Sequence, residues 1–287
     1  MVKKPVALRK IVLLGISVIL IFCVIPTVIY IHRDRSFDAP PQIAQRNTPI
    51  DWAAHVKIGI IGDSWVAGGK LDQAIRDVML DSGVSAEIVS SGHPGARSRH
   101  IYQDMLSAES KPFSSQKLFM DEDLDYLVVI AGVNDTAGHI GRDYYAYHML
   151  CIIKAAQTRG IHPVIVEVPE FGIEDNPDNG FMSYMKHTIY RIVFDGRQVN
   201  VIKTYREALK NQITTMMLED MTMVSFSPLV KDYSQSKNLY ANPSHLNKEG
   251  YQQLGSLIVS RAMVIFHFRR GGAKVICHPQ GQGYLPV

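Results

Sequence analysis

Short apolar runs that alternate with longer helical patterns constrain the fold of this chain most. Four of these runs are expected strands: "VKIGIIG" at 56–62, "AEIVSS" at 86–91, "DYLVVIAG" at 125–132 and "HPVIVEVP" at 162–169. Several are too continuously apolar for burial on one face alone. Strands that are buried on both faces and separated by helices indicate a central, mostly parallel sheet in a three-layer α/β/α fold.

The segments between these strands carry helical periodicity instead. One more short strand, "VNVIK", is expected at 199–203, whereas residues 217–228 show no clear pattern. A chain of 287 residues is long enough to bury a sizeable core. The expected helices cover residues 71–81, 99–108, 143–158, 181–193 and 248–266.

An uncharged stretch from Ile11 to Ile31, "IVLLGISVILIFCVIPTVIYI", precedes the expected domain. At about 1.5 Å per residue, a helix of this length matches a hydrocarbon core of roughly 30 Å. A cleaved signal peptide is the alternative, but no small-residue cleavage site follows the run. We therefore expect an uncleaved transmembrane helix at 11–31.

Basic residues flank this stretch unequally, with four before it and two shortly after it. The positive-inside tendency places the N-terminus in the cytoplasm and the rest of the chain outside the inner (plasma) membrane, which is the periplasm in a Gram-negative bacterium. The expected organisation is a cytoplasmic N-terminus (1–10), a transmembrane helix (11–31), a linker (32–54), a folded domain (55–267) and a C-terminal tail (268–287).

Charge and cysteine content exclude several classes of function. A net charge of +3, without Lys/Arg runs interleaved with aromatics, argues against a nucleic-acid partner. Three cysteines and no His-Glu-x-x-His motif predict neither a disulfide scaffold nor a metal site. Cys151 and Cys277 could pair in an oxidising compartment, but Cys151 lies in an apolar helical stretch, where a buried free thiol is the more ordinary expectation.

Polar loops follow three of the expected strands, and a fourth opens the last helix. They read "GDSW" at 62–65, "SGHPGARS" at 91–98, "GVNDTAG" at 132–138 and "NPSHLNKEGY" at 242–251. In parallel sheets, reactive groups lie beyond the carboxyl ends of the strands. These four loops are therefore expected to form one site.

In this order, the four loops resemble the sequence blocks of the SGNH (GDSL) hydrolase family, over residues 55–267. The resemblance implies a flavodoxin-like α/β/α fold and a serine esterase that needs no cofactor. It assigns the nucleophile to Ser64 and the base to His245, with Ser64, Gly95 and Asn134 forming the oxyanion hole. The family includes lipases, thioesterases, carbohydrate O-acetyl esterases and acetyltransferases.

Each block also has a physical reading. Acyl transfer needs an exposed hydroxyl, a base for its proton and donors for the developing oxyanion. The turn after a strand exposes Ser64, and the unperturbed pKa of histidine, about 6.5, suits His245 as the base. Asn134 offers an uncharged donor, and Gly95 lets the chain approach a substrate closely. Asp63 and Asp135 are expected to support these loops.

The last block departs from the family pattern, because Asn242 stands where Asp-x-x-His has its aspartate. An amide brings no charge and can select the wrong tautomer, and in a serine protease the same change lowers turnover about 10⁴-fold. Three hypotheses remain open. Asn242 orients His245 through its oxygen; or another carboxylate, such as Asp232 or Glu249, lies close; or the domain binds without hydrolysing.

The expected substrate follows from location. A membrane tether with an extracytoplasmic domain favours an envelope or exported polysaccharide whose O-acetyl or other acyl groups are removed or transferred. The alternatives are a lysophospholipase or lipase with an apolar groove to which Met217–Val224 contributes, or a binding and assembly subunit. Tyr144, Tyr145 and Tyr147 suit either a sugar platform or the core.

Overall fold

The computed structural model describes residues 5–25, 56–107, 115–121, 123–172 and 201–269, together with single residues between 27 and 43 and at 188 and 192. The chain divides into two compact units, Met1–Asp38 and Ala39–Val287. The first unit contains helix α1 (Pro5–Ile19), which continues into a π-helical turn, η1 (Leu20–Val24). The second unit contains the sheet and the candidate site.

Five parallel strands form the central sheet, in the order β2-β1-β3-β4-β5. This is the strand order of flavodoxin-like folds, and it confirms the expected parallel sheet. The carboxyl ends of the three strands nearest the site are level, because Gly62 pairs in register with Gly92 and with Ile130. The strands are β1 (Val56–Gly62), β2 (Ala86–Gly92), β3 (Tyr126–Ile130), β4 (His162–Val166) and β5 (Thr222–Val224).

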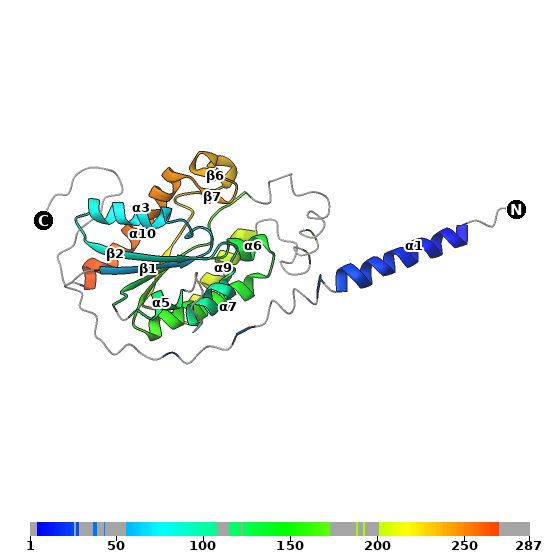
Figure 1. Cartoon of the computed structure of the whole chain (residues 1–287), viewed down its shortest axis with the longest axis horizontal. Helices are drawn as coiled ribbons and strands as arrows, with labels where there is room; N and C mark the ends of the chain where they lie inside the picture. Colours follow the sequence, from blue (N-terminus) through cyan, green and yellow to red (C-terminus); the bar gives the residue numbers. More distant parts are fainter. Residues whose placement is uncertain are drawn as a thin grey trace. The chain divides into compact units, whose positions relative to one another are not determined.

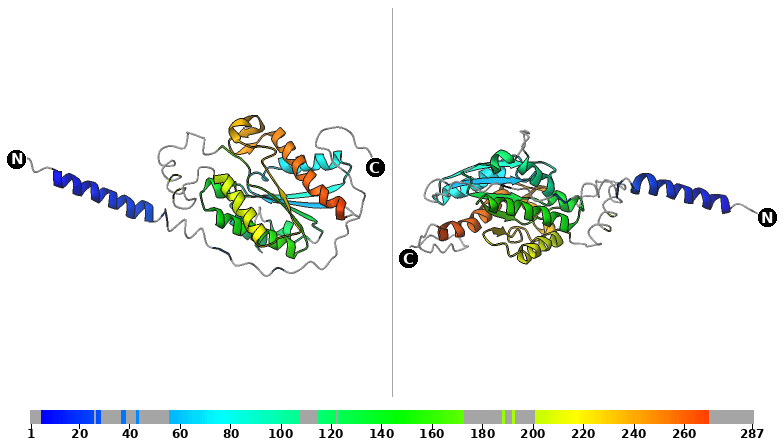
Figure 2. Two further views of the ribbon diagram at one scale, coloured as in Figure 1. Left: turned by 180° about the vertical axis from the view of Figure 1, so that it is seen from behind. Right: turned by 90° about the horizontal axis from the view of Figure 1, so that it is seen from below.

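Helices cover both faces of this sheet (Figures 1 and 2). Successive residues of β3 show why: Val128 and Ile130 join the core under one layer, and Leu127 and Val129 join the core under the other. One layer holds α3 (Lys70–Asp81) and α10 (Lys248–Arg269). The other holds α4 (Ser98–Leu106), α5 (Gln116–Phe119), α7 (Arg142–Thr158) and α9 (Val201–Thr215).

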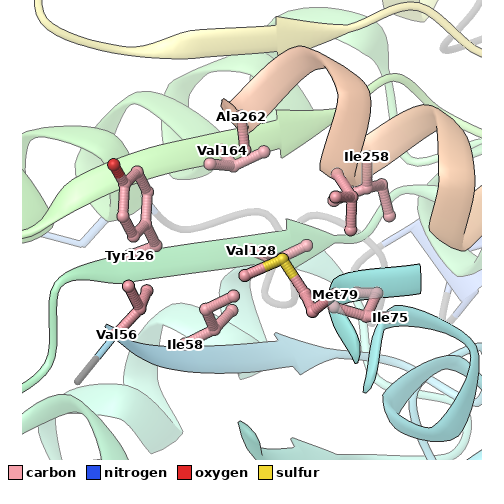
Figure 3. Close-up of a pocket in the computed structure, with 10 residues that line it drawn as sticks. Val56, Ile58, Ile75, Met79, Tyr126, Val128, Val164, Ile258 and Ala262 are labelled. Carbon is pink, nitrogen blue, oxygen red and sulfur yellow. The ribbon is translucent and has the colours of Figure 1, made fainter. Parts of the chain in front are cut away.

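A small apolar cavity lies between the sheet and the layer of α3 and α10 (Figure 3). Val56 and Tyr126, the first residues of β1 and β3, are among its lining residues, with Met79 of α3 and Ile258 of α10. No charged side chain lines it. It therefore lies at the amino end of the strands, away from the loop that carries Ser64.

The expected strand "VNVIK" is wrong, because Val201 is the first residue of helix α9. The buried side chains of α9 are Val201, Thr204, Tyr205 and Leu209, a spacing that follows the helical period. A short apolar run cannot by itself distinguish the two periods. The fifth strand is β5 instead, only three residues long, inside the segment 217–228 that showed no pattern.

Several expectations fall partly or wholly outside the described residues. The helix expected at 181–193 is one, and the partner of Cys151 in the proposed disulfide, Cys277, is another. Cys151 itself is buried in α7. Within the described part of the chain, none of the helices combines the length and apolar character required to cross a membrane. Residues 26 and 29–31 of the expected span are not among those described.

Between β5 and α10 the chain forms small elements that the sequence patterns did not predict. Two 3-10 helices, η3 (Tyr233–Gln235) and η4 (Lys237–Leu239), lead into an antiparallel hairpin of β6 (Tyr240–Asn242) and β7 (His245–Leu246). Asn242 and His245 are register partners across this hairpin. The turn between them therefore decides how the two side chains meet.

Candidate active site

Ser64 lies in the turn that connects β1 to α3. The buried carboxylate of Asp63 holds the turn, because its Oδ1 accepts a hydrogen bond from the Trp65 backbone N–H at 2.9 Å. A side chain at Gly92 would place its Cβ 2.2 Å from the Ala67 nitrogen, so only glycine lets the end of β2 approach this turn. Ser64 remains half-buried, with its hydroxyl at the carboxyl edge of the sheet.

The structure brings Ser64, His245 and Asn242 together. His245 Nε2 lies 2.9 Å from Ser64 Oγ, across 181 residues of chain. On the other side of the ring, His245 Nδ1 lies 3.1 Å from Asn242 Oδ1. The hydroxyl, the imidazole and the orienting oxygen thus lie in the spatial order that activation of a serine requires.

The orientation of the Asn242 amide is fixed by its own turn. The Ser244 backbone N–H donates to Asn242 Oδ1 at 3.0 Å, and the Ser244 hydroxyl donates to the same oxygen at 3.1 Å. A backbone N–H can only donate, so the atom it meets must be the amide oxygen. His245 Nδ1 faces that same oxygen and must carry the proton. The neutral ring then presents its lone pair on Nε2, toward Ser64.

The two alternative carboxylates do not reach His245. Asp232 caps η3, where its Oδ1 accepts hydrogen bonds from the backbone and the hydroxyl of Ser234. Glu249 accepts a hydrogen bond from Gln253 on α10 at 3.2 Å. Among the described residues, no carboxylate contacts His245. The amide of Asn242 is therefore the group that orients the ring.

The environment of His245 favours its neutral form. Burial lowers the pKa of the His245 imidazole below its ordinary value of 6.5, and the positive charge of Lys70 lowers it further. A carboxylate at 242 would act in the opposite direction, since an opposite charge stabilises the imidazolium. With the amide, His245 is a neutral base near pH 7.

Ser64, Gly95 and Asn134 carry the three donors of the predicted oxyanion hole. In the described part of the chain, the backbone N–H groups of Ser64 and Gly95 have no acceptor. Gly95 is exposed and has a φ of 79°, a conformation that favours glycine. Asn134 Nδ2 donates to the Ala96 carbonyl at 2.9 Å, with Asp63 Oδ2 a longer 3.4 Å away. Asn134 therefore ties the Gly95 loop to the Ser64 turn.

Asp63 and Asp135 lie beneath these loops, and both are fully buried. Asp135 accepts hydrogen bonds from the Ser98 backbone at 2.9 Å and from the Ser98 hydroxyl at 2.6 Å. Burial raises the pKa of Asp63 to about 7 and that of Asp135 to about 6. In both cases hydrogen bonds oppose the rise, and the charge of Asp135 adds to the shift of Asp63.

Four further residues lie near the site, although sequence reasoning did not single them out: Trp65, Lys70, Ser244 and Tyr251. The buried ring of Trp65 lies beside His245, with 6.5 Å between ring centroids, and beside Tyr251, at 6.2 Å. The Lys70 ammonium lies 5.9 Å from the centre of the Tyr251 ring. Trp65 stands in the quoted "GDSW", and Ser244 in "NPSH". Neither motif, however, says which way a side chain or an N–H points.

Two suggested substrate contacts lie elsewhere. Tyr144 and Tyr145 are buried in α7, so they are core residues and not a sugar platform. Residues 222–224 of the segment Met217–Val224 form β5, the edge strand of the sheet, while Met217 is 83% exposed. Among the described residues, no cluster of three or more His, Cys, Asp or Glu side chains could hold a metal ion.

The fold and the strand-end site define the α/β/α class to which SGNH hydrolases belong. Solved structures with this fold include a GDSL-like lipase from Bacteroides thetaiotaomicron, with 14% sequence identity and a TM-score of 0.51, covering 82% of this chain and 96% of that one. A family 3 carbohydrate esterase from Clostridium thermocellum has 14% identity and a TM-score of 0.52, covering 75% and 99%.

An esterase from a Pseudoalteromonas species, solved in a form inhibited by monoethylphosphonate, has 13% identity and a TM-score of 0.51, covering 74% of this chain and 98% of that one. No protein-family model matches the sequence, and no curated protein does. At these identities the similarity establishes the SGNH hydrolase fold alone.

Proposed function

We propose that this chain is a membrane-anchored, extracytoplasmic serine esterase of the SGNH type. It removes or transfers O-acetyl or other acyl groups on an envelope or exported polysaccharide. The observation that carries the proposal is the continuous hydrogen-bonded series from Ser64 Oγ through the His245 ring to Asn242 Oδ1. The orientation of that amide by Ser244 supports the proposal, because it selects the His245 tautomer whose Nε2 can accept the Ser64 proton.

The proposed reaction has two steps, acylation of Ser64 and then removal of the acyl group. As the Ser64 oxygen forms a bond to the ester carbonyl carbon, His245 Nε2 takes the hydroxyl proton, and the carbonyl oxygen becomes an anion facing the N–H groups of Ser64 and Gly95. The ester C–O bond then breaks, and His245 returns the proton to the departing alcohol. Water, or a sugar hydroxyl in a transferase, attacks the acyl-serine by the reverse route.

The proposal of a membrane anchor is based on the sequence and exposure of residues in the first unit, Met1–Asp38. Uncharged residues fill 11–31, and apolar side chains of α1 and η1, such as Leu14 and Phe22, are 68% and 71% exposed. The basic residues that precede them favour a cytoplasmic N-terminus and a periplasmic or otherwise extracytoplasmic esterase domain. A protease that degrades the domain in spheroplasts but not in intact cells would support this location.

Substitution of the proposed nucleophile tests the enzyme itself. Ser64→Ala should lower hydrolysis of 4-nitrophenyl acetate by roughly 10⁴-fold or more, because the attacking oxygen is lost. A fluorophosphonate probe should label the wild-type chain and not the variant. Equal turnover by both proteins, or the absence of labelling in wild type, would instead favour a binding and assembly subunit.

Substitution of the orienting amide tests the mechanism. Asn242→Ala should lower kcat by about 10²-fold or more, whereas Asn242→Asp should leave kcat unchanged or raise it. The carboxylate should also raise the pKa of His245 and move the acid limb of the pH–rate profile to higher pH. An unchanged profile in Asn242→Asp would contradict contact between the two side chains.

The substrate class needs a comparison of release assays. Acetate release from acetylated xylan or peptidoglycan should exceed fatty-acid release from lysophospholipid. The reverse order would favour the lysophospholipase alternative.

A further inference from the structure

A groove with a volume of about 330 Å³ opens between the first turns of α3 and α10. Both helices begin at the carboxyl edge of the sheet, one shortly after Ser64 and the other shortly after His245. The groove lining comprises Gly68, Gly69, Lys70, Gln73, Ala74, Asp77, Lys248, Tyr251 and Gln252. The proposed reaction does not use any of these side chains.

Positive charge predominates in this groove. The side chains of Lys70 and Lys248 are exposed, and neither forms an ion pair with a described residue. Asp77 is the acidic residue of the lining, and its Oδ1 accepts a hydrogen bond from Gln73 Nε2 at 2.5 Å. The lining therefore carries two ammonium groups and only one carboxylate, which already accepts a hydrogen bond.

The first turn of α3 adds unused donors to the same place. Gly69 caps the helix without a side-chain hydrogen bond. In the described structure, the backbone N–H groups of residues 70–72 have no acceptor. Such groups and the helix dipole favour an anion at a helix start. The lysines and these N–H groups act in the same direction.

The groove is close enough to the catalytic pair to hold part of the same substrate. Aromatic rings connect them, because Trp65 lies beside both His245 and Tyr251, and Lys70 lies over the Tyr251 ring. The charge of Lys70 also influences the His245 ring, whose pKa it lowers. Lys70 is therefore near enough to His245 for its charge to act on the imidazole ring.

Resting on the esterase function proposed above, we propose that this groove binds the carboxylate of an acidic sugar, so that the preferred substrate is an acylated uronate-containing glycan. Lys70 and Lys248 hold the carboxylate. The amide side chains of Gln73 and Gln252 suit sugar hydroxyls, since amides both donate and accept hydrogen bonds. The two lysines distinguish an acidic ligand from a neutral one by charge, and the Tyr251 ring at the same groove can pack against a sugar face.

Acetate release from two matched substrates tests the proposal: acetylated oligogalacturonate, which is acidic, and acetylated xylo-oligosaccharide of equal length, which is neutral. The double variant Lys70→Gln/Lys248→Gln should lose about tenfold in kcat/KM on the acidic substrate and less than about twofold on the neutral one. Assays near pH 8 keep His245 neutral in every variant, so the effect of Lys70 on its pKa does not enter. Added salt should weaken only the acidic reaction.

Lys203→Gln is the matched control. Lys203 lies on α9, in the opposite helical layer, and is 69% exposed beside Glu207. This variant should behave as wild type on both substrates. Equal losses on both substrates in the double variant, or no loss on either, would overturn the acidic-glycan proposal while leaving the esterase proposal intact.

Binding gives a readout that needs no turnover. By calorimetry, Ser64→Ala should bind oligogalacturonate more tightly than neutral xylo-oligosaccharide, and the added lysine substitutions should remove the difference. If Ser64→Ala retained full esterase activity, the proposed function would fail, but this binding comparison would still decide the groove. Lysine-dependent hydrolysis of lysophosphatidylglycerol in preference to the glycan would assign the groove to a lipid phosphate and overturn the proposal.

Discussion

The carboxyl edge of the sheet has two halves, in which the pKa values of buried carboxyl groups shift in opposite directions. Beneath the loops after β1 and β3, the buried Asp63 and Asp135 receive hydrogen bonds from backbone N–H, hydroxyl and amide donors, and burial raises both pKa values. After β4, the buried Glu167 meets Lys210 and lies 4.0 Å from Arg206. Burial alone would raise the pKa of Glu167, but hydrogen bonds from Lys210 and Ser225 outweigh it and leave that pKa lowered.

The two halves suit two different tasks: one holds the proposed reaction at Ser64, and the other ties α9 to the sheet through ion pairs. Negative charge near the developing oxyanion would oppose the reaction, because buried charges interact strongly. Asp63 and Asp135, with pKa values of about 7 and about 6, lose that charge only as the pH falls through these values, while their hydrogen bonds brace the Ser64 turn and the Asn134 loop. The charged half is free to use ion pairs, since Arg206 and Lys210 tie α9 to the end of β4.

The largest expected effect comes from placing a further charge beside Asp63. Asn134→Asp removes the donor to the Ala96 carbonyl and adds a carboxylate beside Asp63. We expect kcat on 4-nitrophenyl acetate to fall by about 10³-fold, as when an oxyanion donor is lost. Asn238→Asp, at an exposed position before β6, is the control and should retain full activity. A loss below tenfold in Asn134→Asp would contradict the need to keep further negative charge away from Ser64.

The next effect comes from removing the charge in the other half. Glu167→Gln removes the buried partner of Lys210 and the longer contact of Arg206, which keeps its ion pair with Glu170, and should lower the free energy of unfolding by about 3 kcal/mol in urea titrations. Glu207→Gln breaks an exposed pair with Lys203 on α9 and should change it by less than about 0.5 kcal/mol. Similar losses in both variants would show that burial of Glu167 adds nothing.

The smallest effect is a pH dependence that comes from Asp63. Because the folded-state pKa of Asp63 is about 7 and its ordinary value is 3.8, the folded chain binds more protons than the unfolded chain between these values. Stability should therefore fall as pH rises from about 4 to about 7. Asp63→Asn keeps an oxygen for the Trp65 N–H and should be more stable than wild type by about 1–2 kcal/mol near pH 8.

The same substitution should have little effect on stability near pH 4, where Asp63 is protonated in the folded chain. Thermal unfolding at both pH values measures the contrast. Asp123→Asn, at an exposed position, is the matched control. If the advantage of Asp63→Asn were equal at both pH values, a raised pKa of Asp63 would not be its cause.

The sheet was predictable because its central strands are apolar on both faces and end in recognisable turns. "VKIGIIG" matches β1 residue for residue. The edge strand β5 could not be found, since three residues give no periodicity, and "VNVIK" was misread because its five residues fit either period. In that region, tertiary packing and not local pattern decides between helix and strand.

The candidate site was predictable in its residue types but not in its geometry. The sequence placed Ser64, Gly95, Asn134 and His245 at loop positions that the parallel sheet brings to one edge. It could not say whether Asn242 presents its oxygen or its nitrogen to the ring, because a backbone N–H settles that question. The groove at Lys70 and Lys248 depends on two helices that start far apart in the sequence.

Under the proposed function, the turn after Asn242 implies a simple rule for recognising esterases of this kind. Because the backbone N–H of residue 244 orients the amide, any residue except proline at that position preserves the arrangement. A search pattern that demands an acid three places before the histidine would discard this chain as a dead enzyme. A pattern that also accepts asparagine, provided that the second residue after it is not proline, would keep it, and Ser244→Pro is the substitution that should silence it.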